Sequence, residues 1–353
     1  MQKILLFIAS LFYFNFLFSK NEIKSWQGIH ETPLSRLEQQ FAEPPVEFAN
    51  HVIWGWEGKM DKKTICNDLD SIKKKGFRAV IFEAGYKLPF KYLSEEWFKA
   101  IRTGVLEAKK RGMKVWIIDE GKYPSGFAGG KFSQERPDLR MQALVIGDTI
   151  QIKRGEVMTN HKIAPEIISA VAVSTSGAPN RTVAINNGEI SFNAGLDDWK
   201  ILLVKSDFRT AVTRAVNNPN GGKDATNSLC DYLNPVAVQQ FIDWTHKQYK
   251  KYLGKELGTT VLGFRGDEPD YAHLPWTPSI VQTFKDTKGY DPTPYLASFF
   301  TTSPTIQEQR VKADYWDVWY SLFATHFFKL QADWCAANGV AHITHLNKEH
   351  EMP

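Results

Sequence analysis

The stretch LEAKKRGMKVWIIDEG, residues 106–121, joins a helical segment to a strand through one glycine. The helix is expected to end at Gly112, because glycine takes the left-handed conformation that closes a helix at low cost. The β-branched and aromatic run that follows is typical of a buried parallel strand. Asp119 and Glu120 come at the carboxyl end of that strand. The stretch therefore predicts one α/β unit whose strand ends on two carboxylates.

The same helix–glycine–strand pattern occurs three more times, and an initial strand is expected at HVIWGW (51–56). The further copies are LDSIKKKGFRAVIFEAG (69–85), YLGKELGTTVLGFRGDEP (252–269) and DWCAANGVAHITHLN (333–347). Helices that alternate with parallel strands predict an α/β fold.

Two α/β architectures fit this pattern, a (β/α)8 TIM-type barrel and an open doubly wound sheet. The open sheet usually carries a glycine-rich phosphate loop after its first strand, and HVIWGWEGKMDKK contains no GxGxxG. The stretch SGFAGGK (125–131) does not match the GxxxxGK[ST] pattern of a P-loop either. The strands are followed by carboxylates, which collect at the carboxyl face of a barrel. The barrel is therefore favoured.

The expected barrel strands number about six, including an uncertain one near 201–213, whereas a closed barrel has eight. The sequence is thus expected to be incomplete at its C-terminus. Within it, residues 143–208 consist of short alternating runs separated by turn pairs such as Asn187-Gly188, which predict an inserted small antiparallel β domain. Residues 20–142 and 209–353 are then the two parts of the barrel.

The N-terminus predicts that the mature protein is located outside the cytoplasm. A basic start is followed by an apolar run of about 15 residues, which suits a secretory signal better than a membrane span of roughly 20. We expect a signal peptide over residues 1–19 and a secreted or periplasmic mature protein without a membrane span; an uncleaved anchor is the alternative.

Composition excludes several classes of protein. The chain has 43% apolar and 23% charged residues, which is typical of a globular protein and excludes disordered and collagen-like chains. A formal charge of +4 gives no support for a nucleic-acid partner. Three widely spaced cysteines form neither a disulfide framework nor a CxxC metal site.

The strongest motif for chemistry is VLGFRGDEPDY (261–271), in which an apolar strand is followed by Asp267 and Glu268. Adjacent strand residues point to opposite faces, so the two carboxylates are expected to differ in role. A structural alternative is a strand-end salt bridge or helix cap. One protonated and one ionised carboxyl group are what cleavage of a glycosidic bond requires.

Two other strand ends carry polar groups. WIIDEGKYPSGFAGGKF (116–132) has a second Asp-Glu pair and a glycine-rich loop that either approaches a ligand with its backbone or only forms a tight connection. HITHLNKEHE (342–351) suggests groups that grip sugar hydroxyls. A zinc site is disfavoured there, because His342 and His345 are three positions apart and face opposite sides of the strand.

These motifs, in this order, resemble the α-L-rhamnosidase family of glycoside hydrolases, family 106 and its relatives. The resemblance rests on WGWEGKMDKKTICNDLDSIKKKGFRAVIF, on the stretch YLSEEWFKAIRTGVLEAKKRGMKVWIIDEGKYPSGFAGG and on VLGFRGDEPDY. It covers roughly 45–142 and 228–353. The sequence departs from the family by stopping short and by having DEGKYPSG where DENGWPSG is more usual.

The resemblance implies a secreted or periplasmic enzyme with a (β/α)8 barrel, an inverting two-carboxylate mechanism and, in some members, calcium. By motif, Glu268 resembles the general acid, and Glu349 is the best match for the second catalytic carboxylate. The residues expected to hold the sugar are Trp56, Asp119, Glu120, Tyr123, Asp267, His345 and Asn347. No metal ligand is assigned.

The sequence therefore predicts a hydrolase that cleaves a glycosidic bond in plant or microbial polysaccharide, with α-L-rhamnosidase as the activity that the resemblance implies. Its partner would be an oligo- or polysaccharide. The alternative is a non-catalytic carbohydrate-binding protein or an inactive fragment of a larger hydrolase. Replacing Glu268 by glutamine separates the two, since it abolishes hydrolysis and leaves lectin-like binding in place.

Overall fold

The computed structural model describes residues 33–43, 50–121, 123–209, 228–271 and 273–346. The chain divides into two compact units, Met1–Ala49 and Asn50–Pro353. In the first unit the structure describes helix α2 (Leu34–Ala42). The expected signal peptide, residues 1–19, lies outside the described residues.

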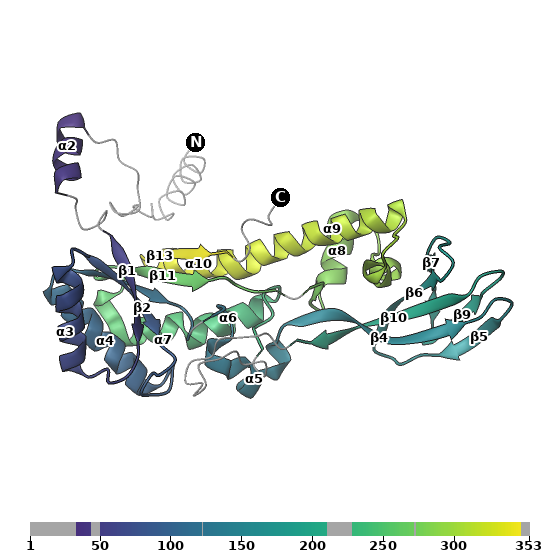
Figure 1. Cartoon of the computed structure of the whole chain (residues 1–353), viewed down its shortest axis with the longest axis horizontal. Helices are drawn as coiled ribbons and strands as arrows, with labels where there is room; N and C mark the ends of the chain where they lie inside the picture. The colour runs from purple at the N-terminus through teal and green to yellow at the C-terminus, as the bar shows by residue number, and fades with distance from the viewer. Residues whose placement is uncertain (1–32, 44–49, 122, 210–227, 272, 347–353) are drawn as a thin grey trace, which may run out of the picture. The chain divides into compact units, whose positions relative to one another are not determined.

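The second unit contains a five-stranded parallel sheet, as the repeated pattern predicts (Figure 1). Its strands lie in the order β1-β2-β3-β11-β13, and all neighbouring pairs are parallel. The bounds are β1 (His51–Trp56), β2 (Ala79–Ala84), β3 (Lys114–Ile118), β11 (Val261–Asp267) and β13 (Ala341–His345). Each of the five strands predicted from the repeated pattern and the initial run is confirmed.

Helices precede four of these strands, and three of the four end where the glycines predict. They are α3 (Lys62–Lys74), α4 (Glu95–Lys110), α7 (His246–Leu253) and α10 (Lys329–Ala337). The helix before β11 ends at Leu253, five residues before Gly258, with Gly254 as its C-cap, so the predicted end at Gly258 is wrong. The backbone φ is positive at Gly76, Gly112, Gly258 and Gly339. Side-chain caps define two helix starts: Asp61 accepts a hydrogen bond from the backbone N–H of Thr64, and Ser94 accepts one from Trp97.

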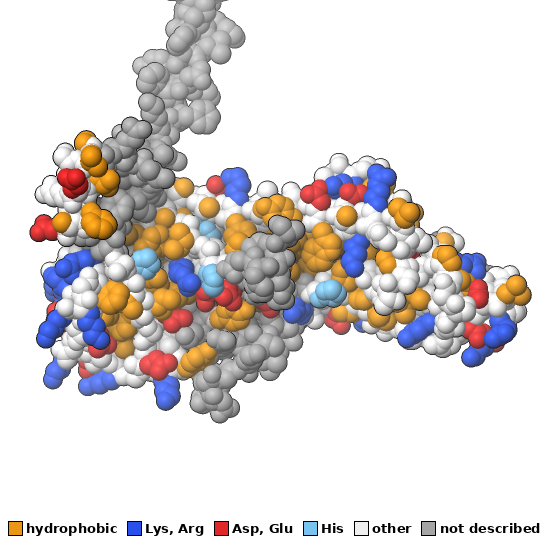
Figure 2. All heavy atoms as spheres, turned by 45° about the horizontal axis from the view of Figure 1, so that its top comes forward, with side chains coloured by type: hydrophobic (Ala, Val, Ile, Leu, Met, Phe, Trp, Pro, Cys, Tyr) orange, Lys and Arg blue, Asp and Glu red, His pale blue; other side chains and the backbone are white. Residues whose placement is uncertain are grey.

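One face of the parallel sheet packs against these helices. Phe82, Ile117 and Phe264 are register partners on neighbouring strands and belong to one buried cluster with side chains of α3, α4 and α7. Side chains alternate along strands, so Ile53 and Ile343 point to the other face, where both are exposed. Figure 2 shows hydrophobic side chains on the surface over this part of the molecule.

The described strands therefore form an open α/β sheet with β1 and β13 at its edges, rather than a closed barrel. They number five and not about six. The uncertain strand near 201–213 is β10 (Trp199–Phe208), which pairs in an antiparallel sheet, because its neighbours β4 and β6 run opposite to it.

Residues 142–208 form antiparallel strands, most of them in a five-stranded sheet of order β12-β4-β10-β6-β7 and a three-stranded sheet of order β5-β9-β8. Asn187 and Gly188 both have positive φ, as a two-residue hairpin turn requires. The strands are β4 (Gln142–Ile152), β5 (Val157–Lys162), β6 (Ile167–Ser174), β7 (Arg181–Thr182), β8 (Ile185–Asn186), β9 (Glu189–Asn193), β10 and β12 (Pro275–Trp276). The division into separate domains at 143 and 208 stays a prediction.

This unit contains further helices. They are α5 (Lys131–Glu135), α6 (Pro235–Trp244), α8 (Ile280–Lys288) and α9 (Ile306–Leu322), with 3-10 turns at Ala128–Gly130, Pro137–Leu139, Gly254–Glu256 and Thr293–Phe300. A π-helical segment, Phe323–Phe328, joins α9 to α10. None of the helices in the described part of the chain is long and apolar enough to cross a membrane.

Candidate active site

The carboxyl ends of β3, β11 and β13 bring three of the polar motifs together. These strands are neighbours, and the backbone hydrogen bonds between them continue one residue past the ends of β3 and β11. The backbone N–H of Asp119 donates to the carbonyl of Arg265 at 3.1 Å, and the N–H of Glu268 donates to the carbonyl of His345 at 2.8 Å. Asp119, Asp267, Glu268 and His345 therefore lie at one edge of the sheet.

Ser125 ties the end of β3 to the end of β11. Its hydroxyl donates to Asp119 Oδ1 at 2.6 Å and accepts from the backbone N–H of Asp267 at 2.7 Å. The Ser125 N–H also donates to the Asp267 carbonyl at 2.9 Å, and the Tyr232 hydroxyl donates to the Ser125 carbonyl. Ser125 is fully buried. This one residue fixes the position of the strand end that carries Glu268.

The Glu120 carboxylate holds the glycine-rich loop after β3 in place by accepting hydrogen bonds from its backbone. Its Oε1 accepts from the N–H groups of Gly121 (2.6 Å) and Gly129 (2.8 Å), and its Oε2 accepts from Phe127 (2.9 Å) and Ala128 (2.6 Å). Burial acts to raise the pKa of Glu120, whereas these donors act to lower it. With two donors on each oxygen, the geometry fits the ionised carboxylate.

The prediction that Glu120 holds sugar is therefore wrong for this structure, because the side chain is 0% exposed and both oxygens are used by the loop. The loop forms a tight connection here and does not offer these N–H groups to a ligand. Gly126 is needed within it, since its φ is +114° and a Cβ would lie 2.5 Å from Tyr232 Cε1.

Asp119 differs from Glu120 in its hydrogen bonding. The side chain is fully buried, and burial raises the pKa of Asp119 to about 7. Its Oδ2 has no hydrogen-bond partner among the described residues. A buried carboxyl oxygen without a donor fits the protonated acid better than the anion. Asp119 contacts the site through Ser125 and presents no exposed surface to a sugar, which contradicts the predicted direct contact.

Glu268 and Asp267 both approach the His345 imidazole. His345 Nδ1 lies 3.1 Å from Glu268 Oε1 and 3.6 Å from Asp267 Oδ1. Asp267 Oδ1 also pairs with Arg265 Nη1 at 3.2 Å. The two carboxylates share a neighbour because Glu268 has a φ of +38°, which ends the strand alternation that predicts opposite faces. The Glu268 side chain keeps 30% of its surface exposed, enough to contact a ligand.

The other predicted residues fall into three groups. Trp56 is 0% exposed and packs against Trp54, Phe82 and Trp97, so the structure contradicts its predicted contact with sugar. Tyr123 is half-buried and lies in the loop after β3, two residues before Ser125. Asn347 and Glu349 lie outside the described residues, and their roles stay predictions.

Calcium, which the family resemblance implies, stays a prediction for the residues that the structure describes, because backbone and amide oxygens can also bind it. Among those residues no three His, Cys, Asp or Glu side chains come together to hold a metal ion. Asp267 is paired with Arg265 and both Glu120 oxygens accept from backbone. We therefore derive no step through a metal.

Sequence reasoning missed Ser125 and Tyr232 as parts of the site. Ser125 had a visible signal, because it is a small polar residue in the glycine-rich loop that follows the Asp-Glu pair after β3. Tyr232 had none, because its contact with Ser125 spans 107 positions.

A match to a known family decides the class of this protein. Residues 159–352, more than half of the chain, match the family described as alpha-L-rhamnosidase, glycoside hydrolase family 106. The chain belongs to this α-L-rhamnosidase family. The prediction of a rhamnosidase-like glycoside hydrolase is thereby confirmed.

Two similar proteins place the family match in context. The chain is 23% identical over 360 residues to a Formosa agariphila protein named "Putative beta-glucuronidase", covering 87% of this chain and 30% of that protein. The solved rhamnosidase from Novosphingobium sp. PP1Y matches with a TM-score of 0.63 at 14% identity, over 90% of this chain and 47% of that one. The chain thus spans less than half the length of each, and the second likeness shows a shared fold.

Proposed function

We propose that this member of the α-L-rhamnosidase family hydrolyses a glycosidic bond in a rhamnose-containing oligo- or polysaccharide, with Glu268 as the general acid. The observation that supports it is the placement of Glu268 at the carboxyl edge of the parallel sheet, partly exposed and beside the His345 imidazole. Catalytic residues of α/β barrel enzymes collect at this edge. The protein is proposed to act outside the cytoplasm, as its N-terminus predicts.

In the proposed reaction Glu268 gives its proton to the glycosidic oxygen as the bond from that oxygen to the anomeric carbon breaks. A second carboxylate, for which Glu349 remains our proposal, removes a proton from the water that attacks the opposite face of the sugar. His345 holds the Glu268 carboxyl from its Nδ1 side, and Asp267 keeps Arg265 and His345 in place. An inverting enzyme of this type needs roughly 6.5–9.5 Å between its two carboxyl groups.

The five described strands are proposed to be part of a closed (β/α)8 barrel. The exposed Ile53 and Ile343 on the open face of the sheet support this, since further strands would bury them.

The test is hydrolysis of 4-nitrophenyl α-L-rhamnoside by the full chain and by Glu268→Gln. The variant should lose at least about 10²-fold in kcat, because a positioned general acid contributes about 10²–10⁴-fold. Glu57→Gln, an exposed carboxylate just after β1, is the matched control and should stay within twofold of wild type. An equal effect of both substitutions would refute the role of Glu268. Sugar binding without turnover by the unsubstituted chain would favour the carbohydrate-binding alternative.

A further inference from the structure

The segment that follows Glu268 carries an exposed aromatic ring. Tyr271 lies three residues after Glu268 and is 37% exposed, whereas most large aromatic side chains of the described chain are buried. The segment then returns to the fold at β12, which pairs with β4. Tyr271 is therefore held between two anchored points, one of which is the candidate catalytic strand end.

Buried rings support Tyr271 from behind. Its ring centroid lies 4.7 Å from that of Trp319 and 6.0 Å from that of Phe323. Trp319 and Phe323 stack on each other at 5.2 Å with 26° between their planes. Both belong to the helical run of α9 and the π-helical segment, and both are buried. Tyr271 is thus the exposed end of a rigid aromatic column, which we call the Tyr271 platform.

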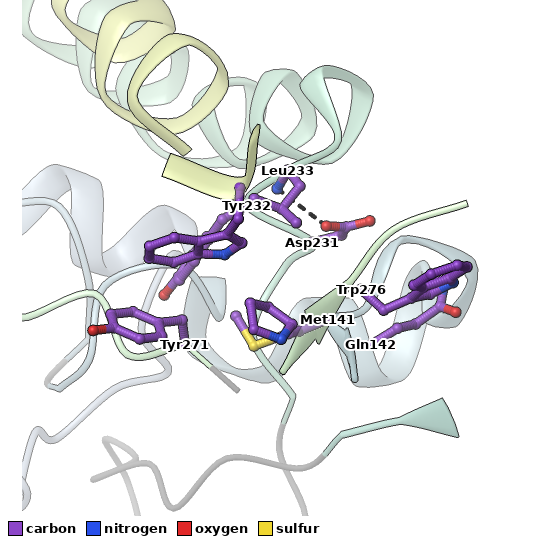
Figure 3. A pocket seen from close by; sticks show the side chains of 9 residues that line it. Met141, Gln142, Asp231, Tyr232, Leu233, Tyr271 and Trp276 are labelled. Carbon is purple, nitrogen blue, oxygen red and sulfur yellow. Dashed lines mark hydrogen bonds between the residues drawn. The ribbon is translucent and has the colours of Figure 1, made fainter. Parts of the chain in front are cut away.

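The platform borders a hollow whose walls are largely apolar. Tyr271, Trp319 and Tyr232 line it together with Met141 and Pro275 (Figure 3). Asp231 also reaches this hollow, but its oxygens accept from the Leu233 N–H at 3.1 Å and from the Thr277 hydroxyl at 2.7 Å. That carboxyl is therefore already bonded. The hollow is too small to enclose a sugar ring, so a ligand would lie against the exposed face of Tyr271 at its rim.

We propose that the Tyr271 platform is the binding site for the sugar ring on the leaving-group side of the cleaved bond. This inference rests on the proposed function. A general acid contacts the leaving-group oxygen, so the ring that bears this oxygen lies on the side of Glu268. The C–H face of a pyranose ring is apolar and stacks on an aromatic ring, while the Tyr271 hydroxyl can bond a sugar hydroxyl.

The test compares two ligands and three variants. The ligands are an α-L-rhamnosyl-glucose disaccharide and methyl α-L-rhamnoside, which lacks the second ring. Binding is measured by tryptophan fluorescence in the Glu268→Gln background, so that no ligand is consumed. Tyr271→Ala should weaken disaccharide binding about tenfold and change methyl rhamnoside binding less than twofold. Tyr271→Phe, which keeps the ring, should stay within about threefold of the parent.

Tyr320→Ala is the matched control, because Tyr320 is 66% exposed on α9 but belongs to no ring pair of the column. It should leave both affinities unchanged. Equal losses for the two ligands in Tyr271→Ala, equal losses for Tyr271→Ala and Tyr320→Ala, or no disaccharide binding by the parent would each overturn the platform. Failure of the proposed function would give a different result, in which Glu268→Gln still hydrolyses the substrate.

Discussion

The chain places two Asp-Glu pairs at the ends of neighbouring strands, and the structure gives them opposite surroundings. Asp119 and Glu120 are 0% exposed, and both carboxyl groups bond within the loop that follows β3. Asp267 and Glu268 keep exposed surface and face the imidazole of His345. An Asp-Glu pair at the end of a buried strand therefore anchors a loop in one place and provides a candidate catalytic group in the other. What differs is burial and, for Glu120, the four backbone N–H groups that reach its carboxylate.

The largest effect on stability is expected for Glu120→Gln. The amide NH2 would face two of the four backbone N–H groups that now donate to the carboxylate. Two buried donors left unsatisfied at about 1–3 kcal/mol each predict a loss of about 2–6 kcal/mol. Urea unfolding measures it, with Glu268→Gln as the matched variant of the exposed pair, expected to lose less than about 1 kcal/mol. Equal losses would remove the distinction between the pairs.

The second effect is a pH dependence of the unfolding free energy, which arises from Asp119 in the buried pair. Burial raises the pKa of Asp119 to about 7 from an ordinary value near 3.8. A raised carboxyl pKa stabilises the fold below the unfolded-state pKa, and this stability is lost as pH rises through about 7. Asp119→Asn does not titrate. Its unfolding free energy relative to wild type should therefore improve by up to about 4 kcal/mol between pH 4 and pH 7, at about 1.4 kcal/mol per pH unit.

Guanidinium unfolding of both proteins at several pH values checks this dependence. A constant difference between the two proteins would show that Asp119 is ionised in the fold throughout, and that its Oδ2 has a partner.

These buried roles show what the sequence could predict. The five parallel strands and the glycine ends of three of their helices follow from local patterns, because helix closure and strand burial depend on neighbouring residues. The environment of each carboxylate does not, since Glu120 meets donors from a loop whose course is set by Gly126 against Tyr232. Trp56 was misjudged for a related reason: its position at a strand end looked accessible, but helix α4 covers it at Trp97.

The smallest stability effect concerns the hydroxyl that joins the two pairs. Ser125→Ala leaves the Asp267 N–H without its acceptor, at a cost of about 1–3 kcal/mol. Hydrogen exchange of the Asp267 amide should become at least about tenfold faster. Ser298→Ala removes a similarly buried hydroxyl, which donates to the Tyr295 carbonyl, and is the control. If Asp267 exchanges equally slowly in both variants, Ser125 does not hold this strand end.

The most direct test of the contrast between the pairs is the hydrolysis rate per folded molecule for Glu268→Gln and Glu120→Gln. Rates on 4-nitrophenyl α-L-rhamnoside are divided by the folded fraction taken from each unfolding curve. We expect Glu120→Gln to keep its rate within about tenfold of wild type, since its carboxylate touches only the loop, and Glu268→Gln to fall at least about 10²-fold. A larger loss in Glu120→Gln than in Glu268→Gln would contradict the account and assign the chemistry to the buried pair.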